Sequence, residues 1–308
     1  MPHLPVMINE IAEIAHKLSP DSIIVDATFG GGGHSSVLAS ILNEKGIFIG
    51  LDRDPYILGR YGQKTNTAKC EVFLKNSEFS KLDEILEEMG IFNIDFILAD
   101  LGVSSFQLDE SNRGFSFSKE GPLDMRMGNT GETLLEKLQK SEFSELKTII
   151  KKYGEEPSAH KIALEILKAV QNNSLKTTTD LSNLISKTVR KPKNGKHPAT
   201  KTFQALRIWV NDELGEIEQF MLKAPKYLAP KGILAIITFH SLEDRIVKQR
   251  FKNLAHPEKL LHPDLPLTKE QMPKAYFKET GPIIPTKTEI QKNPRARSAK
   301  LRILQRIV

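Results

Sequence analysis

Short apolar runs alternate with amphipathic stretches over the first hundred residues of the chain. Each run is bounded by polar residues or glycine, as in buried strands. The predicted strands are 23–27, 47–51, 70–74 and 94–99. Helical spacing of apolar positions occupies 35–42 and 79–89. Strands that alternate with helices predict a parallel, doubly wound α/β sheet, in which ligands bind beyond the carboxyl ends of the strands.

The pattern changes between residues 131 and 189, where the apolar spacing is helical throughout. The helices predicted there are 134–139, 143–153, 158–170 and 181–189. One long amphipathic helix is then expected at 202–222, a buried strand at 232–238 and an edge strand at 300–308, where apolar and basic residues alternate. The simplest organisation is an α/β domain formed by 1–108 and 200–308, interrupted by an all-helical insertion at 109–199.

Four consecutive glycines, Gly30 to Gly33, lie between the first predicted strand and the helix that follows it. Glycines let the backbone approach a ligand closely, and a helix start offers N–H groups and a positive dipole end. Asp52 ends the second strand and is well placed to accept both hydroxyls of a ribose. The pattern predicts a nucleotide-cofactor site, although a glycine-rich turn without a ligand is the simplest alternative.

Two cofactors compete for this loop. A dinucleotide site expects G-x-G-x-x-G, which the contiguous glycines match only loosely. Asp26, four residues before the first glycine, would lie badly beside a pyrophosphate. It suits the sulfonium and ammonium groups of S-adenosylmethionine. We therefore favour S-adenosylmethionine, with a nicotinamide-dependent oxidoreductase as the weaker alternative.

Composition narrows the class of protein and its cellular compartment. Of 308 residues, 39% are hydrophobic and 27% are charged, which is typical of a soluble globular protein. Cys70 is the single cysteine, so an internal disulfide is excluded and a reducing cytoplasm is the natural compartment. Neither a signal-peptide core nor a run of membrane-spanning length is present. We expect a cytoplasmic protein without a membrane partner; the oligomeric state stays open, and a homodimer is compatible with the sequence.

The formal net charge of +6 is concentrated in two clusters, at 190–197 and 292–306. Clustered basic residues beside a cofactor fold favour a polyanionic partner. A further stretch, 113–117, combines a cation with two phenylalanines and is suited to stacking an unpaired base. The RNA-binding candidates are Arg113, Lys193, Lys196, Arg295 and Arg297.

Asp100 ends the fourth predicted strand and precedes a tight loop containing Gly102 and Ser104. A carboxylate at this position can accept a hydrogen bond from an amine, so Asp100 is the first catalytic candidate and Ser104 the second. Gln107 follows, with a donor and an acceptor for an adenine edge. Around His240 no partner has metal-ligand spacing, and no metal site is predicted.

These residues belong to blocks that resemble the bacterial 16S ribosomal RNA cytosine-N4 methyltransferases, over nearly the whole chain. The blocks include 26–35, 52–55, 100–105, 113–117, 122–127, 153–156, 197–200, 203–207, 239–245 and 293–302. The family methylates the exocyclic amine of a decoding-centre cytidine. The resemblance implies a Rossmann-like class I methyltransferase sheet with a helical insertion for substrate recognition. The S-adenosylmethionine contacts that it implies are Gly32, Gly33, His34, Asp52, Phe79, Asp100 and Gln107.

The expected reaction is in-line attack of the cytosine N4 on the sulfonium methyl group, with 16S rRNA or the small ribosomal subunit as partner. Many amino-methyltransferases carry Asp/Asn-Pro-Pro-Tyr/Phe after the fourth strand, whereas this chain has Asp100-Leu101-Gly102-Val103. The aromatic ring that stacks the cytosine must therefore come from elsewhere. Without the resemblance, the residues alone leave DNA or another RNA open as the substrate. A non-catalytic RNA-binding protein would have no need of acids at the strand ends.

Overall fold

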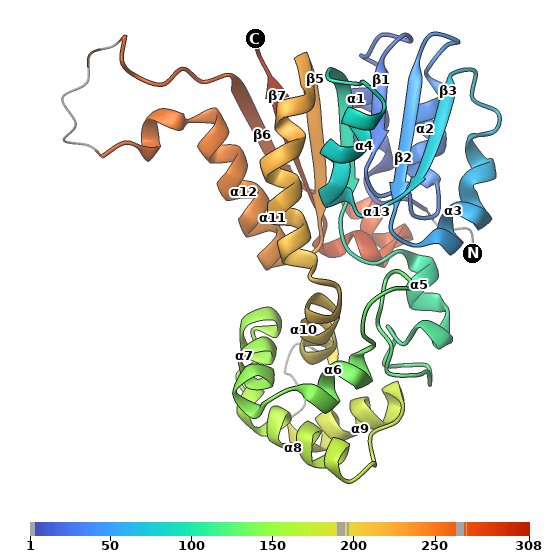
Figure 1. Ribbon diagram of the computed structural model, residues 1–308, viewed down its shortest axis with the longest axis vertical. Helices are drawn as coiled ribbons and strands as arrows, with labels where there is room; N and C mark the ends of the chain where they lie inside the picture. The colour runs from blue at the N-terminus through green and yellow to red at the C-terminus, as the bar shows by residue number, and fades with distance from the viewer. Residues whose placement is uncertain (1–3, 190–194, 196, 263–267, 269) are drawn as a thin grey trace. The chain divides into compact units, whose positions relative to one another are not determined.

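The computed structural model describes residues 4–189, 195, 197–262, 268 and 270–308 (Figure 1). Two compact units make up the chain: Met1–Gly102 together with Leu214–Val308, and Val103–Glu213. We call the first the sheet unit and the second the helical unit. The chain thus leaves the sheet unit once and returns to it once, as an inserted unit requires.

Seven strands form one sheet in the order β3-β2-β1-β4-β5-β7-β6. Their bounds are β1 Ile23–Asp26, β2 Ile47–Asp52, β3 Glu71–Asn76, β4 Ile94–Asp100, β5 Leu228–Thr238, β6 Phe277–Ile283 and β7 Lys300–Arg306. The strands from β1 to β5 pair in parallel, whereas β7 is antiparallel to both of its neighbours. This arrangement confirms the predicted Rossmann-like class I α/β sheet.

The parallel register brings the predicted acids to one edge of the sheet. Asp26 pairs with Gly50 and Leu98 on the two neighbouring strands, so β1 lies between β2 and β4. Asp52 and Asp100 end those two strands. Three carboxyl groups far apart in the sequence therefore end adjacent strands at the same edge.

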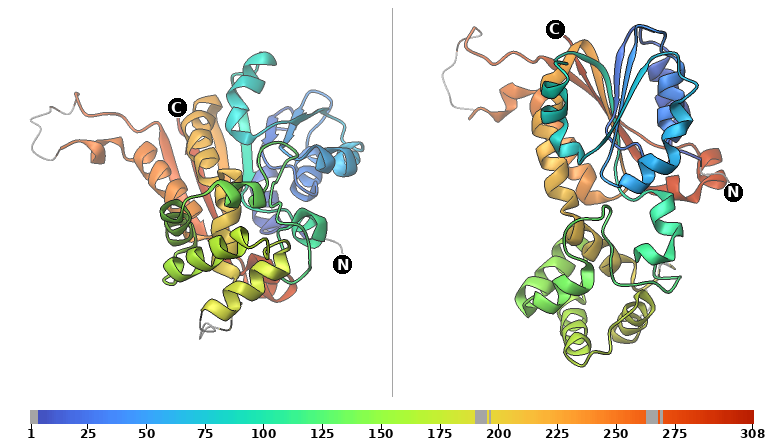
Figure 2. Two further views of the ribbon diagram at one scale, coloured as in Figure 1. Left: turned by 60° about the horizontal axis from the view of Figure 1, so that its bottom comes forward. Right: turned by 45° about the vertical axis from the view of Figure 1, so that its right-hand side comes forward.

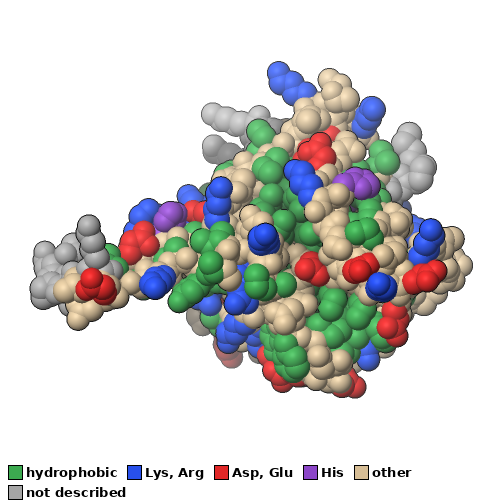
Figure 3. Space-filling view, turned by 90° about the horizontal axis from the view of Figure 1, so that it is seen from above, with side chains coloured by type: hydrophobic (Ala, Val, Ile, Leu, Met, Phe, Trp, Pro, Cys, Tyr) green, Lys and Arg blue, Asp and Glu red, His purple; other side chains and the backbone are tan. Residues whose placement is uncertain are grey.

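Helices cover both faces of the sheet (Figures 1 and 2). On one face lie α4 (Leu82–Glu88), α11 (Glu213–Lys223) and α12 (Ser241–Ala255), whose apolar side chains form a core with the strands. On the other lie α1 (Ile8–Ala15), α2 (Gly33–Ser40) and α3 (Pro55–Tyr61). A short helix near the C-terminus, α13 (Lys287–Lys292), completes the sheet unit. On the face seen in Figure 3, acidic and basic side chains are interspersed, and its described residues form no broad field of one charge.

The helical unit has its own core. Its helices are α5 (Ser105–Asp109), α6 (Leu134–Lys140), α7 (Phe143–Gly154), α8 (Ala159–Gln171), α9 (Thr178–Thr188) and α10 (Thr200–Asn211). This unit extends beyond the predicted insertion 109–199 at both ends. Phe203 and Leu206 of α10 are buried in its core, and Leu108 packs against the same core. The limits of the helical unit are therefore set by which side chains are buried in its core, and not by where the predicted strands stop.

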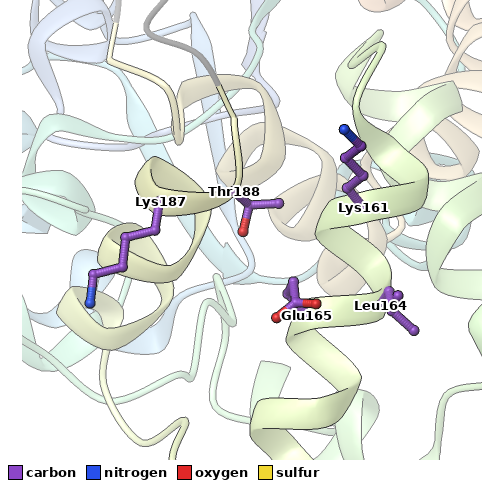
Figure 4. A pocket seen from close by; sticks show the side chains of 5 residues that line it. All are labelled: Lys161, Leu164, Glu165, Lys187 and Thr188. Carbon is purple, nitrogen blue, oxygen red and sulfur yellow. The ribbon is translucent and has the colours of Figure 1, made fainter.

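A shallow hollow of about 310 Å³ lies between α8 and α9 in the helical unit (Figure 4). It is lined by Lys161, Leu164, Glu165, Lys187 and Thr188. The Glu165 carboxylate in this lining is paired with Lys168, 2.9 Å away. None of these residues is among those predicted to bind cofactor or RNA. In the described part of the chain, no helix has both the length and the apolar character needed to cross a membrane.

The predicted single helix 202–222 is wrong, because the structure has two helices there. Asp212 separates α10 from α11 and adopts a left-handed conformation, with φ 48° and ψ 40°. The side chain before it, Asn211, donates to the Met125 carbonyl at 2.7 Å and to the Arg207 carbonyl at 2.9 Å. These bonds fix the end of α10 through a contact 86 residues away, which apolar periodicity cannot reveal.

The prediction of an edge strand at 300–308 is also wrong, because β7 lies between β5 and β6. The alternating basic residues suggested a solvated edge, but Arg302 is 6% exposed and donates to Asp244 of α12 at 2.7 Å. The true edge is β6, which sequence periodicity did not predict. Its residues are mostly exposed and include Gly281 and Pro282, so the strand carries little apolar signal.

Candidate functional site

The glycine loop joins β1 to α2, and its conformation explains the run of glycines. Gly30 and Gly32 have φ values of 51° and 69°, in the left-handed region that favours glycine. A Cβ on Gly33 would lie 2.3 Å from Cγ of Pro5, so only glycine fits under the N-terminal segment. The loop is thus built for tight backbone approach at the start of a helix.

Asp26 holds the two ends of this loop together. Its Oδ2 accepts from the Ser35 hydroxyl at 2.5 Å, and its Oδ1 accepts from the Thr28 N–H at 3.1 Å. The side chain is 1% exposed, and this burial raises the pKa of Asp26 to about 6. Asp26 therefore supplies loop geometry and negative charge, while Ser35 and Thr28 are supporting residues that sequence reasoning did not single out. A hydroxyl on each side of the glycine run was the available signal.

Asp52 supports the loop from the neighbouring strand. Its Oδ2 accepts from the Gly30 N–H and its Oδ1 from the Asp54 N–H, both at 2.8 Å. Burial raises the pKa of Asp52 to about 6, and the nearby Asp54 and Asp26 carboxylates add to this shift. Each carboxylate oxygen can accept more than one hydrogen bond. The group can therefore hold the loop and two ligand hydroxyls at once.

Asp100 carries an unsatisfied acceptor. Its backbone N–H donates to the Thr28 hydroxyl at 2.6 Å, which ties the end of β4 to the glycine loop. Its Oδ1 is buried and makes no hydrogen bond with any residue that the structure describes. Burial, together with the charges of Asp26 and Glu243, raises the pKa of Asp100 well above its ordinary value. A buried acceptor without a donor is energetically costly, so a hydrogen bond from a ligand N–H to this oxygen would be favourable.

His34 presents a second acceptor to the same space. Its Nε2 lies 2.9 Å from the Val6 carbonyl and its Nδ1 lies 3.6 Å from Oδ2 of Asp100. Burial lowers the pKa of His34 to about 4, so the ring is neutral at pH 7. Because a carbonyl can only accept, the hydrogen sits on Nε2 and the Nδ1 lone pair faces Asp100. The imidazole of His34 therefore acts as a hydrogen-bond acceptor here, and its position does not require a role as a catalytic base.

Carboxylates concentrated at one sheet edge decide which ligand fits. The Asp26 charge raises the pKa of both Asp52 and Asp100, and the Glu243 charge adds to the rise at Asp100. A pyrophosphate would add two negative charges to this environment and be repelled. A cation with N–H donors would relieve the repulsion and satisfy the open acceptors. The dinucleotide alternative therefore fails on charge.

Comparison with known proteins agrees with this geometry. The family model described as the MraW methylase family matches residues 1–307. The chain belongs to the MraW methylase family. Among curated relatives, a protein of Caldicellulosiruptor bescii is 44% identical, and the match covers 99% of each chain. One from Clostridioides difficile is 42% identical over 99% of each chain, and one from Shewanella oneidensis is 41% identical over 99% of this chain and 97% of its own. Each of the three is named ribosomal RNA small subunit methyltransferase H.

This MraW family member is a methyltransferase, and S-adenosylmethionine is its methyl donor. The residues present fit that cofactor on two observations. The Oδ2 of Asp100 and the Nδ1 of His34, which face each other at 3.6 Å, are a pair of acceptors suited to an ammonium group. The left-handed glycines contribute no side chains of their own at the turn, so their backbone can approach a ligand closely.

Phe79, a predicted cofactor contact, lies just after β3. It opens a short 3₁₀ helix, Phe79–Lys81, and its half-buried ring packs edge-to-face on Phe220 at 5.3 Å between centroids. Asn76, at the end of β3, donates to the Asp52 carbonyl at 2.8 Å, which links this segment to the end of β2. Hydrophobic periodicity assigned Phe79 only to a helix start. The available signal was an aromatic residue shortly after a strand's carboxyl end.

Gln107 and Ser104 lie in the helical unit and have local partners. Ser104 Oγ accepts from the Gln107 N–H at 3.2 Å, and Gln107 Oε1 accepts from the Ser104 N–H at 3.1 Å, a capping box that starts α5. The Gln107 Nε2 also donates to the Met127 carbonyl at 3.2 Å. The Ser104 hydroxyl thus has a structural role at the start of α5, and its catalytic role stays a prediction.

The RNA-binding candidates differ in their exposure and in their hydrogen bonds. Arg295 and Arg297 are exposed on the 3₁₀ helix Pro294–Ser298. Arg113 is half-buried and donates through Nη2 to the Met127 carbonyl at 2.8 Å, so its guanidinium supports the helical unit. Lys193 and Lys196 lie outside the described residues.

The two phenylalanines of the 113–117 stretch also differ. Phe115 is buried in the core of the helical unit. The half-buried Phe117 stacks on His197, with 4.7 Å between ring centroids and 13° between ring planes, and contacts Phe203 edge-to-face. His197 is itself exposed, so the stacked pair lies at the surface of the helical unit.

Affinity for S-adenosylmethionine is expected to fall as the pH is lowered through about 6. Asp26 and Asp52 have pKa values raised to about 6, so both lose their charge in that range and attract a cation less. A bound cation favours the ionised carboxylates, so binding near pH 6 should release protons. Calorimetry in two buffers of different ionisation enthalpy measures both effects. An affinity that stays constant from about pH 7.5 to about pH 5.5 would contradict this electrostatic account.

Proposed function

We propose that this protein methylates the exocyclic N4 amine of a cytidine in the decoding centre of 16S rRNA, using S-adenosylmethionine. The relatives' names supply the class of substrate, small-subunit ribosomal RNA. The observation that carries the chemistry is the buried, unpartnered Oδ1 of Asp100 at the end of β4, beside the glycine loop. An exocyclic amine has the N–H donors that this acceptor lacks.

We propose that the cofactor contacts are Gly32, Gly33, His34, Asp52, Phe79, Asp100 and Gln107. The positive φ values of Gly30 and Gly32 support backbone approach at the loop, and the position of Asp52 beside that loop supports its binding of the ribose hydroxyls. We assign the cofactor base to the half-buried ring of Phe79. When bound, S-adenosylmethionine supplies an electrophilic methyl group on a sulfonium. Every other contribution to the reaction comes from groups of the protein and the RNA.

Asp100 has two uses in this proposal. The N4 lone pair is conjugated into the cytosine ring and is a weak nucleophile. By accepting an N4 hydrogen, the carboxylate raises electron density on that nitrogen. The raised pKa of Asp100 then allows the same oxygen to take the N4 proton as positive charge develops there. Holding the amine and the methyl group in line supplies the larger share of the rate enhancement, since orientation of reactants lowers the barrier by about 7–11 kcal/mol.

The base must leave its stack to present the amine, and the flanking RNA must be held meanwhile. The stacked Phe117–His197 pair offers a ring face on which an unpaired base could stack. Exposed Arg295 and Arg297 suit phosphate groups. These residues make a better RNA-binding set than Arg113, whose guanidinium supports its own unit.

The test is mass spectrometry of nucleosides from small ribosomal subunits and from free 16S rRNA, each isolated from cells lacking the protein and incubated with the purified enzyme and labelled S-adenosylmethionine. The expected product is labelled N4-methylcytidine at one decoding-centre position, and the two substrates show which form is used. Label in another nucleoside, or in DNA supplied in parallel, would contradict the proposed substrate and identify the actual one.

Replacing Arg295 and Arg297 together by glutamine is expected to weaken RNA binding and flatten its salt dependence. Each lost phosphate contact reduces the slope of log affinity against log salt by about 0.7 to 0.9. Binding titrations at several salt concentrations measure the slope. Lys161→Gln is the matched control, because this lysine lines the hollow of the helical unit and is not assigned to RNA. An unchanged slope in the double variant would remove both arginines from the RNA-binding set.

A further inference from the structure

Residues Leu4–Met7 form an N-terminal strap over the glycine loop. The Pro5 ring occupies the space that a side chain on Gly33 would need. The Val6 carbonyl is the partner of the His34 Nε2, and the Val6 and Met7 side chains are 5% and 0% exposed. The strap therefore belongs to the wall of the donor site, although it lies outside every predicted site residue.

Two residues near the opposite end of the chain hold this strap. Glu289 of α13 accepts from the Met7 N–H through Oε1 at 2.6 Å. Asn293 donates from Nδ2 to the Leu4 carbonyl at 3.0 Å. Asn293 also caps the following 3₁₀ helix by accepting from the Arg295 N–H at 3.3 Å. The Met7–Glu289 contact spans 282 positions of the chain and the Leu4–Asn293 contact spans 289. The two contacts lie on either side of Val6.

The position of Val6 controls which nitrogen of His34 carries hydrogen. With the carbonyl in place, Nε2 donates and Nδ1 offers a lone pair toward Asp100. If the strap moved away, the neutral ring could carry its hydrogen on Nδ1 instead. That N–H would point at Oδ2 of Asp100 and occupy an acceptor that the ligand needs. The strap thus decides whether His34 and Asp100 act as a pair of acceptors or bond to each other.

We propose that Glu289 and Asn293 are positioning residues of the methyl-donor site: they fix the strap, the strap fixes the tautomer of His34, and the tautomer keeps two acceptors open for the ammonium group of S-adenosylmethionine. This inference rests on the donor site alone and not on the RNA substrate proposed above. It can therefore be tested without RNA, and it can fail while the proposed substrate stands.

The test combines nitrogen NMR of the histidine rings with calorimetry of S-adenosylmethionine binding, on the full-length protein. The chain has 8 histidines, and the spectrum of His34→Gln assigns the His34 signals. In the wild type we expect hydrogen on Nε2 and a bare Nδ1. In Glu289→Ala the signals should shift toward the other tautomer, and affinity should fall on the order of tenfold, as for loss of a hydrogen bond to a charged group.

Two further variants separate positioning from general loss of structure. Glu289→Gln retains an acceptor for the Met7 N–H, so it should restore both the His34 signals and the affinity. Asn293→Asp keeps the size of the side chain but loses the donor to Leu4, so it should behave like Glu289→Ala and carries the test if that variant does not fold. Unchanged His34 signals in a folded Glu289→Ala or Asn293→Asp would overturn the inference. So would a Glu289→Gln variant as impaired as Glu289→Ala.

Discussion

Replacing Asp100 by alanine is expected to lower the turnover number for methyl transfer by about 10²–10⁴-fold, the range for a group that handles a proton in the transition state. The carboxylate is the acceptor at the end of β4 that lacks a protein donor, so no other described side chain at this position replaces it. Cofactor affinity should fall less than in Asp52→Ala, because the glycine loop keeps its hydrogen bonds to Asp52. Single-turnover kinetics with saturating RNA, together with calorimetry of the cofactor, measures the two effects separately.

Asp100→Asn and Asp95→Asn are the controls for this experiment. Asparagine at position 100 keeps the shape but removes the charge, so turnover should stay low. The raised pKa of Asp100 means that its ionised form costs folding free energy above its unfolded pKa, so Asp100→Asn should not lower the Tm at pH 8. Asp95, at the amino end of the same strand, accepts from the Ile23 N–H at 2.8 Å, and its replacement should leave turnover unchanged. Near wild-type turnover in Asp100→Ala would reject the assigned role.

Replacing Asp52 by alanine is expected to weaken S-adenosylmethionine binding by roughly 10²–10⁴-fold. Hydrogen bonds to a charged group contribute about 1.5–3 kcal/mol each, and the ribose would lose two of them. The substitution also removes the acceptor of the Gly30 N–H, so the loop loses its support from β2. Calorimetry, or thermal shift with increasing cofactor, gives the dissociation constant.

Asp52→Asn distinguishes loop support from ribose binding. The amide oxygen can still accept one backbone N–H, whereas its NH₂ group opposes the other donor, so affinity should lie between wild type and Asp52→Ala. A melting curve for each variant without cofactor separates loss of binding from unfolding. If Asp52→Ala bound the cofactor as tightly as Asp95→Asn, the ribose contact would have to be assigned to another residue.

Much of the site was predictable because its signals are local. The glycines and Asp26 are within eight residues of one another, and the conformations at Gly30 and Gly32 agree with the need for glycine. Asp52 and Asp100 were recognised because each follows an apolar run that reads as a strand. Parallel strands then bring their carboxyl ends to the same edge of the sheet, whichever order the strands adopt.

The failures have the opposite cause. Asp212 interrupts a helix that periodicity predicts as continuous, and the bond that fixes the break runs from Asn211 to Met125. Strand β6 lacks an apolar pattern because it is exposed at the sheet edge. Arg302 suggested a solvated strand but is buried against Asp244, where a paired charge replaces an apolar side chain.

The sequence by itself determined the α/β sheet, the glycine loop after the first strand and the acids at the strand ends, because periodicity, glycine spacing and strand termini are properties of neighbouring residues. Only the tertiary structure decided what those acids do. It showed Asp26 closing the loop, Asp100 with an unpartnered oxygen, and His34 held as an acceptor by a carbonyl that Glu289 and Asn293 position. Burial and long-range hydrogen bonds set protonation and tautomer, and these depend on residues that meet only when the chain has folded.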